Sequence, residues 1–365
     1  MDELKFYTLA SILDYRALYN IIFGERSNGK TYSVLKYGLE RYVKHKETMA
    51  VLRRWQEDFK GKRAVSIFDA LIANDEIIQL TGGVWESVYY WSGRWYLCKT
   101  NEKGKRIIDD TPFAYAFSLS SMEHDKSTSF PTITTIMFDE FLTRGIYLPD
   151  EFVLFCNVIS TIVRYRTNVK IFMLGNTVNK YCPYFEEMGI RGVVDMEPGD
   201  LRLYQYGEDG KLKIAVEYTG SISKQGKPSD IYFAFDNPRL KMITGGAWEI
   251  DMYPHCPRKY LPKEVQGKYY INFNGNVLEC EVIAGDDDMF TFIHRKTTEL
   301  QYRPEDLVFT TDYSPKGNIR RRIDKPADKI GQRIWNMFQL DKVFYQSNEI
   351  GEVVRNYLMW CRTEA

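Results

Sequence analysis

The stretch that decides the fold is Tyr19-Asn20-Ile21-Ile22-Phe23-Gly24-Glu25-Arg26-Ser27-Asn28-Gly29-Lys30-Thr31. An apolar run ends in a glycine, and the spacing GxxxxGK[ST] follows without a mismatch. Residues 31–44 then carry apolar or aromatic side chains at helical spacing. Strand, loop and helix in this order predict a phosphate-binding loop. We assign to that loop Gly24, Glu25, Arg26, Ser27, Asn28, Gly29, Lys30 and Thr31.

Each residue type in this loop has a role in binding a nucleotide. The two glycines let main-chain N–H groups turn toward phosphate oxygens, and the helix that follows adds its dipole. Lys30 is expected to reach the outer phosphates and Thr31 to bind a magnesium ion. ATP and Mg²⁺ are therefore the expected cofactors. The alternative is a chance match on a glycine turn, which the correct flanking segments disfavour.

A second apolar run predicts the class of nucleotide chemistry. Residues 133–138 read as a strand buried on both faces, and Asp139-Glu140 follows directly. At the tip of such a strand Asp139 is expected to support Mg²⁺, and Glu140 to polarise water for attack on the γ-phosphate. The alternative is an ordinary acidic strand end facing solvent. The spacing from the phosphate-binding loop favours the catalytic interpretation.

A third strand is expected at 169–174, where Gly175-Asn176 follows. An amide at the tip of a strand beside the Asp139 strand is placed to sense the γ-phosphate or the attacking water. We therefore name Asn176 as a candidate site residue. An asparagine that only shapes a turn fits the spacing equally well, and both interpretations stay open.

Length, charge and cysteine usage bound the remaining classes. The 365 residues predict two domains, and the net charge of zero means that a nucleic acid would be met by local patches. Six cysteines without a CxxC pair and four isolated histidines predict reduced thiols and no structural zinc. Without a membrane-length apolar run or an N-terminal signal pattern, we expect no membrane association.

Arginines follow two of the expected elements. Arg53 and Arg54 follow a short strand at 49–52, where they would contact phosphate or DNA, or form surface ion pairs. Arg164 and Arg166 end a helix expected at 149–165. There they either favour the helix dipole or supply an arginine finger to a neighbouring nucleotide site.

Several segments together resemble a known family, the genome-packaging motor ATPases of small tailed phages of the phi29 type. The resemblance covers about residues 1–190 and is faint beyond them. It is carried by Gly24–Thr31, Lys126-Ser127-x-x-Phe130-Pro131, Phe138-Asp139-Glu140-Phe141, Arg164-x-Arg166, Leu174-Gly175-Asn176 and Pro183-Tyr184-Phe185.

The resemblance implies an α/β fold, a P-loop NTPase domain of the additional-strand catalytic-glutamate (ASCE) type with a mainly parallel sheet. It also implies roles for single residues. Glu140 would be the catalytic base, and Arg164 would complete a neighbour's site, with Arg166 as the alternative finger and Lys126 as a second cation acting in trans. The relatives implied are viral terminases and ring-shaped DNA translocases.

The partners implied by the resemblance are double-stranded DNA, a phage portal and a structural prohead RNA. The subunits would form a homo-oligomeric ring, which we expect to be a pentamer. The protein would work in the host cytoplasm, transiently attached to the prohead.

The expected domain limits are 1–218 for the ATPase domain, 219–246 for a linker and 247–365 for a smaller α+β domain. This last domain resembles an RNase H-like nuclease that has lost its metal site, and it would dock nucleic acid or portal. Asp251 and Asp286-Asp287-Asp288 are candidate metal ligands there, but we expect no nuclease activity. Arg320-Arg321-Arg322 is expected on a loop, where the arginines either contact phosphates of a nucleic acid or form a solvated charge run.

The leading hypothesis is an ATP-driven motor that packages double-stranded viral DNA. The alternatives are another ring-forming DNA translocase or helicase, or a P-loop kinase that acts on a small molecule. A GTPase is disfavoured, since no NKxD sequence follows Glu140.

Overall fold

A computed structural model of the chain divides it into two compact units, Met1–Glu249 and Ile250–Ala365. The predicted linker lies almost wholly outside the residues that the structure describes, so the predicted domain limits stay predictions. Those residues are 6–26, 28–124, 129–143, 147–148, 150–176, 182–207, 209–220, 253–285, 289–312, 314 and 316–363.

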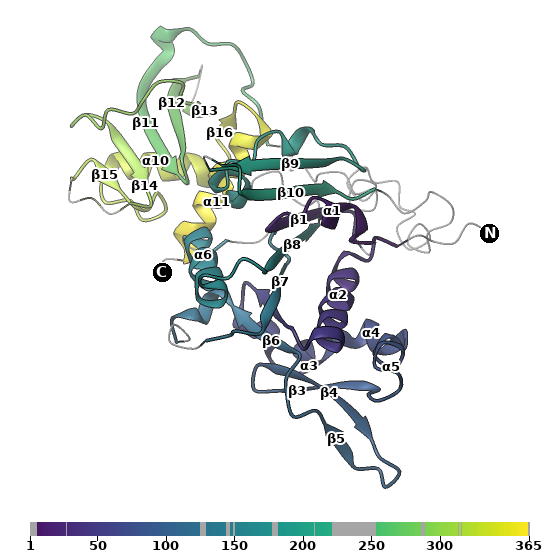
Figure 1. The fold of residues 1–365 in the computed structure, drawn as a ribbon. Coiled ribbons are helices and arrows are strands. Elements are labelled where there is room, and N and C mark those ends of the chain that lie inside the picture. The colour runs from purple at the N-terminus through teal and green to yellow at the C-terminus, as the bar shows by residue number, and fades with distance from the viewer. Residues whose placement is uncertain are drawn as a thin grey trace, which may run out of the picture. The chain divides into compact units, whose positions relative to one another are not determined.

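A large, mainly parallel sheet organises the first unit (Figure 1). Its six central strands run parallel in the order β6-β2-β7-β8-β1-β10. The strand before the phosphate-binding loop, β1, is therefore separated from the Asp139 strand, β7, by an additional strand, β8. This confirms the predicted ASCE-type fold. The bounds are β1 Tyr19–Gly24, β2 Thr48–Arg53, β6 Ala114–Ser118, β7 Ile133–Asp139, β8 Lys170–Asn176 and β10 Leu212–Tyr218.

Antiparallel strands extend the sheet at both edges. On one side β4 pairs with β6, β3 and β5, and on the other β9 pairs with β10. β3 and β4 form a hairpin. The bounds are β3 Ser87–Trp91, β4 Arg94–Thr100, β5 Arg106–Ile108 and β9 Leu201–Tyr206.

The two faces of the sheet carry separate hydrophobic cores. Helix α2 (Lys30–His45) covers one face, and α6 (Glu151–Val163) with α7 (Pro183–Glu187) packs on the other (Figure 1). Successive strand residues alternate between the cores, so Phe138 contributes to the α6 side and Met137 to the α2 side. All seven residues of β7 are buried, which explains its nearly continuous apolar sequence.

Several short helices were not expected from the sequence. They are too short to show a helical period, which explains why the pattern missed them. They are α3 Lys62–Val65, α4 Asp69–Ala73 and α5 Glu76–Leu80, together with 3₁₀ turns at Gln56–Phe59, Ser66–Phe68, Leu119–His124 and Val193–Asp195. A further short helix, α1 Ala10–Asp14, precedes β1.

The second unit is built on a six-stranded mixed sheet of order β15-β14-β11-β12-β13-β16. Strands β11, β12 and β13 form an antiparallel meander. β14 pairs in parallel with β11 and β15 with β14, while β16 pairs in parallel with β13. This arrangement agrees with the expected α+β domain, and its likeness to RNase H stays a prediction. The bounds are β11 Val265–Phe273, β12 Asn276–Ala284, β13 Met289–Arg295, β14 Leu307–Thr310, β15 Ile319–Arg320, β16 Val343–Tyr345, α10 Lys329–Gln339, α11 Asn348–Thr363 and the 3₁₀ turn Pro262–Glu264.

One expectation for this unit is wrong in part. The arginine run was read as a loop, but Ile319 and Arg320 form the edge strand β15 beside β14. Two residues are too few for a strand pattern in the sequence, and the pairing depends on β14.

Among the described residues, no helix is long and apolar enough to cross a bilayer.

Candidate nucleotide-binding and catalytic site

The phosphate-binding loop joins the buried strand β1 to helix α2, as the sequence predicts. Gly24 has φ +146° and Gly29 has φ +95°, conformations that residues with a Cβ rarely adopt. A Cβ on Gly24 would lie 2.2 Å from the hydroxyl of Thr219, so only glycine fits there. Asn28 donates to the same hydroxyl at 2.6 Å, which ties the loop to the end of β10. Ser27 lies outside the described residues.

Lys30 is buried inside the loop and is held by oxygen atoms. Its Nζ donates to the main-chain oxygen of Glu25 at 2.5 Å and to Asn28 Oδ1 at 3.1 Å. Burial lowers the pKa of Lys30 to about 8, while the charges of Asp139 and Glu25 act in the opposite direction. A buried ammonium group with these partners is poised to exchange them for phosphate oxygens, which would compensate its charge more fully.

Thr31 and Asp139 bring oxygen ligands together at the carboxyl edge of the sheet. The Thr31 hydroxyl lies 3.4 Å from both carboxylate oxygens of Asp139. Burial raises the pKa of Asp139, and the nearby Arg53 guanidinium opposes that shift. A hydroxyl and a carboxylate beside the phosphate loop are the hard oxygen donors that Mg²⁺ prefers, so the residues present fit this cofactor.

Glu140 extends from the turn that follows β7. Its φ of +61° lies in the left-handed region, and 64% of its side chain is exposed. The carboxylate forms an ion pair with Arg53 Nη1 at 2.8 Å, and Arg53 Nη2 forms a second one with Asp139 at 2.9 Å. One guanidinium at the end of β2 therefore contacts both acids that were predicted to support the metal and the water.

Arg54, which follows Arg53 in the chain, binds the backbone of the same turn. It donates to the main-chain oxygens of Glu140 at 3.2 Å and Phe141 at 3.0 Å. Its guanidinium also pairs with Glu151 at 2.6 and 2.8 Å, and Tyr184 donates to that carboxylate at 2.8 Å. This buried network fixes the backbone that carries Glu140.

Asn176 lies where the sequence predicted it, at the tip of β8. Its side-chain oxygen lies 3.4 Å from Lys30 Nζ, and its backbone is paired in register with Gly24. The amide therefore faces the phosphate loop, which agrees with a sensing role. Residues 177–181, which would form the turn, lie outside the described residues, so both interpretations of Asn176 stay predictions.

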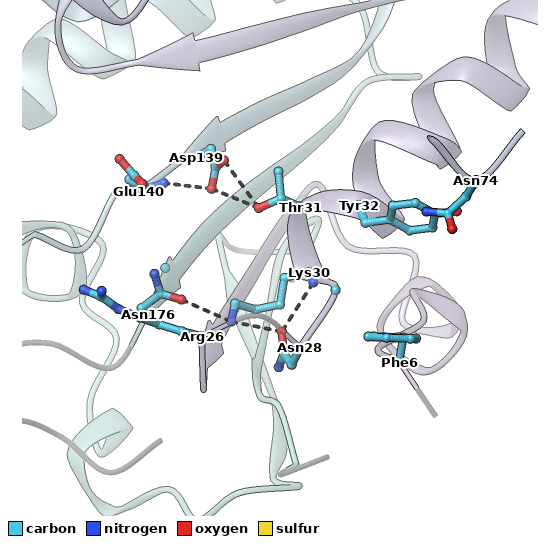
Figure 2. Close-up of a pocket in the computed structure, with 12 residues that line it drawn as sticks. Phe6, Arg26, Asn28, Lys30, Thr31, Tyr32, Asn74, Asp139, Glu140 and Asn176 are labelled. Carbon is cyan, nitrogen blue, oxygen red and sulfur yellow. Dashed lines mark hydrogen bonds between the residues drawn. The ribbon is translucent and has the colours of Figure 1, made fainter. Parts of the chain in front are cut away.

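A cavity of about 640 Å³ lies over this constellation (Figure 2). A neighbouring cavity of about 320 Å³ shares Arg26, Asp139, Glu140 and Asn176 with it. Three residues of the larger cavity, Phe6, Tyr32 and Asn74, belong to no motif and were missed from the sequence. The larger cavity is lined by Phe6, Arg26, Asn28, Gly29, Lys30, Thr31, Tyr32, Asn74, Asp139, Glu140, Gly175 and Asn176.

Arg164 and Arg166, which follow α6, lie at the amino-terminal ends of the parallel strands, whereas the nucleotide site lies at their carboxyl-terminal ends. Arg166 donates to the main-chain oxygen of Ile133, the first residue of β7, whereas Asp139 is the last. A seven-residue strand separates these ends by about 20 Å at roughly 3.3 Å per residue. Arg164, two residues before Arg166, lines neither cavity. It is therefore not brought to the site of its own chain.

Arg166 has a structural role. Its guanidinium also donates to the main-chain oxygens of Phe130, Pro131 and Ile162. These bonds tie the end of α6 to the start of β7, so Arg166 is a poor candidate for a finger. Lys126 lies outside the described residues.

In the second unit, the arginine run is neutralised by its own neighbourhood. Arg320 pairs with Asp328 at 2.5 Å and Arg322 with Asp324 at 2.7 Å. Arg321 donates to the main-chain oxygen of Thr311 and lies over the ring of Trp360. Asp251 and Asp286-Asp287-Asp288 lie outside the described residues.

A different acidic group occurs on the sheet of this unit. Glu279, Glu281 and His294 bring potential ligand atoms within 4.8 Å of one another. Lys268 already pairs with both glutamates, at 2.6 and 2.8 Å. This compensation makes the group an ion-pair cluster.

Comparisons with known proteins find similar phage proteins. A model of the family described as Podovirus DNA encapsidation protein (Gp16) matches residues 97–196. The DNA packaging protein of Bacillus phage phi29 is 27% identical over 189 residues, which cover 51% of this chain and 50% of that protein. This chain resembles phage DNA packaging proteins. The resemblance predicted from the motifs is thereby confirmed. The chain spans about half the length of the curated relatives it matches.

Solved structures extend the likeness to the whole fold. The bacteriophage Phi-29 viral genome packaging motor assembly contains a chain with a TM-score of 0.60 and 20% identity, covering 96% of this chain and 99% of that one. The Phi-28 gp11 DNA packaging motor gives a TM-score of 0.59 at 19% identity, with 98% of each chain covered. At these identities the comparisons show the fold, and both units are included in it.

Proposed function

We propose that this chain is an ATP-hydrolysing motor that moves double-stranded DNA into a phage prohead. The observation that carries the proposal is the meeting of Lys30 and Thr31 with Asp139 and Glu140 around one cavity. These are the parts needed to bind a nucleoside triphosphate and to activate water. The similarity to phage DNA packaging proteins supports DNA as the transported polymer.

In the proposed reaction, Lys30 binds the outer phosphates and main-chain N–H groups of the loop bind the others. Thr31 and Asp139 hold Mg²⁺, which supplies charge neutralisation at the phosphates when bound. Glu140 accepts a proton from the attacking water, and Asn176 senses the γ-phosphate. Arg54 and Glu151 position the Glu140 turn without touching substrate.

In this proposal the site is completed by a neighbouring subunit. Arg164 lies at the opposite edge of the sheet from Asp139, where it would face the nucleotide of the next protomer in a ring. A cation supplied in trans stabilises charge on the transferred phosphoryl group. Lys126 is the second proposed trans cation.

The assembly proposed is a homo-oligomeric ring, a pentamer, attached transiently to the prohead in the host cytoplasm. Its partners are double-stranded DNA, the portal and a structural prohead RNA. We propose no nuclease activity for the second unit, as the resemblance implies. In its described part, Lys268 pairs with both glutamates of the acidic group.

The test is ATP hydrolysis by the full chain, with and without duplex DNA, followed by packaging with proheads. Phosphate release that needs Mg²⁺, is stimulated by duplex and fills proheads is the expected result. Strand separation of the duplex would favour a helicase. Phosphoryl transfer to a hydroxyl compound without release of free phosphate would replace the motor by a kinase.

A further inference from the structure

One end of the nucleotide cavity is lined by residues that the proposed reaction does not use. Phe6, Tyr32 and Asn74 lie at the end away from Asp139 and Glu140, on the other side of the phosphate loop (Figure 2). They come from the segment before α1, the first turn of α2 and the end of α4. A nucleotide whose phosphates occupy the loop would direct its base toward them.

Phe6 is an exposed aromatic side chain on a fixed backbone. The next residue, Tyr7, donates its main-chain N–H to Asn28 at 2.9 Å and its hydroxyl to Glu217 at 2.7 Å. Ser33 donates to the main-chain oxygen of Tyr7 at 2.5 Å. These bonds hold Phe6 against Gly29, and yet 58% of Phe6 remains exposed. A flat apolar surface is therefore presented beside the loop.

Tyr32 presents a second ring whose hydroxyl is already occupied. That hydroxyl donates to Glu76 at 2.5 Å, and Lys36 pairs with the same carboxylate at 2.7 Å. Burial, with Glu76 adding to it, raises the pKa of Tyr32 to about 12, so the ring stays neutral. The hydroxyl is thus anchored on α5, and the ring is left to contact a ligand.

Asn74 adds a polar group with a defined direction. It caps the end of α4, where its Nδ2 donates to the main-chain oxygen of Ala70 at 2.8 Å. That bond uses one of the two N–H groups of the amide and holds the amide in one orientation, in which the side-chain oxygen is left as an acceptor. Adenine carries an amino group, a donor, at its 6-position, whereas guanine carries an oxygen there.

We propose that these three residues form the base-binding end of the site and select adenine over guanine. Phe6 and Tyr32 contact the purine ring, and Asn74 Oδ1 accepts a hydrogen bond from the 6-amino group. A 6-oxo group would face that oxygen with no proton between them, and both acceptors would lose water. This inference rests on the proposed function, because it requires a nucleotide in the phosphate-binding loop.

The test measures dissociation constants of the full-length chain for ATP, GTP and purine riboside triphosphate, which lacks a 6-substituent. The wild-type chain is expected to bind ATP about 2- to 12-fold more tightly than purine riboside triphosphate, the range for one hydrogen bond, and to bind GTP most weakly. Asn74→Leu should bring the ratio of ATP to purine riboside triphosphate to about one. Asn74→Asp keeps an oxygen acceptor and should keep the preference.

Phe6→Ala tests the ring contact separately. Loss of one stacking partner should weaken all three nucleotides together, by about 5- to 100-fold, and leave their ratios unchanged. The matched control is Asn157→Leu, an exposed asparagine on α6 that lines neither cavity, which should change nothing.

Unchanged ratios in Asn74→Leu would overturn the assignment of Asn74, and so would tighter binding of GTP than of ATP by the wild-type chain. If Phe6→Ala changed the ratios of the three dissociation constants, Phe6 would not be a contact that is independent of the 6-substituent. Failure of the proposed function looks different. In that case none of the nucleotides binds, or Lys30→Ala leaves their binding intact.

Discussion

Two arginine groups of this molecule lie at strand ends and differ in where their counter-charges come from. Arg53 ends β2 and Arg54 follows it, and their partners are Asp139, Glu140 and Glu151. These acids lie 86 to 97 residues further along the chain. The group at Arg320-Arg321-Arg322 takes its acids from Asp324 and Asp328, two and eight residues away.

The difference separates a site from a local structural feature. Partners close in sequence neutralise arginines wherever the segment lies, so they stabilise a turn and leave little charge for a ligand. Partners distant in sequence meet only because parallel strands end at the same edge of a sheet, where ligands of open α/β folds bind. We therefore expect variants of the first unit to change chemistry and those of the arginine run to change little.

The largest effect is expected from Arg164→Ala, which removes the proposed trans cation. ATP hydrolysis by the assembled ring should fall about a thousandfold or more, because an arginine finger contributes on that scale. Mixing Arg164→Ala subunits with Glu140→Gln subunits should restore part of the activity, since some interfaces then pair an intact arginine with an intact glutamate. Absence of recovery in rings shown to be mixed would argue for a role within one subunit.

Glu140→Gln should lower hydrolysis by between about a hundredfold and ten-thousandfold, since the amide keeps the shape of the base but accepts no proton. Its affinity for ATP should stay near that of the wild-type chain. Lys30→Ala should instead weaken ATP binding itself. Both are measured by phosphate release and by equilibrium binding. Near-normal hydrolysis in Glu140→Gln would remove Glu140 from its assigned role.

A third prediction compares the ion pairs themselves. Glu151→Ala leaves Arg54 buried without its partner and should destabilise the first unit by about 3–5 kcal/mol. The matched change in the second unit, Asp324→Ala, breaks a pair between residues two apart that is less deeply buried, 14% and 15% exposed against 6% and 1%, and should cost less. Native-state hydrogen exchange at β7 and at β14 reports the two units separately. Equal losses would mean that the distant partners of Arg54 carry no special weight.

These examples show why the sequence predicts some of the molecule and misses the rest. The loop from Gly24 to Thr31 is local, so its spacing alone identifies it, and the apolar run before Asp139 identifies β7. The acidic partner of Arg54 is Glu151, the first residue of α6, and no motif in the sequence marks it. The strand order that brings Arg53 to Glu140 is likewise a tertiary property. Asn74 ends a five-residue helix with no period to read.

The smallest effect is expected from replacing Arg320, Arg321 and Arg322 together by alanine. A cation that contacts phosphate releases counter-ions, so its loss would flatten the salt dependence of nucleic-acid binding by about one unit of slope. Three such losses would be conspicuous. Because Arg320 and Arg322 are paired with aspartates and Arg321 lies over Trp360, we expect the slope for duplex DNA and for structured RNA to change by less than about one unit in total.

The measurement is binding by the full-length chain at several salt concentrations, with basal ATP hydrolysis as a control for the first unit. Asp324→Asn and Asp328→Asn sharpen it, because they release Arg322 and Arg320 from their partners without shortening any side chain. If the run is only structural, these two changes should make the chain bind nucleic acid more tightly and raise the salt slope. A marked flattening in the triple alanine variant would instead show that the arginines leave their aspartates for phosphate. In that case short sequence separation alone would not mark an arginine group as structural.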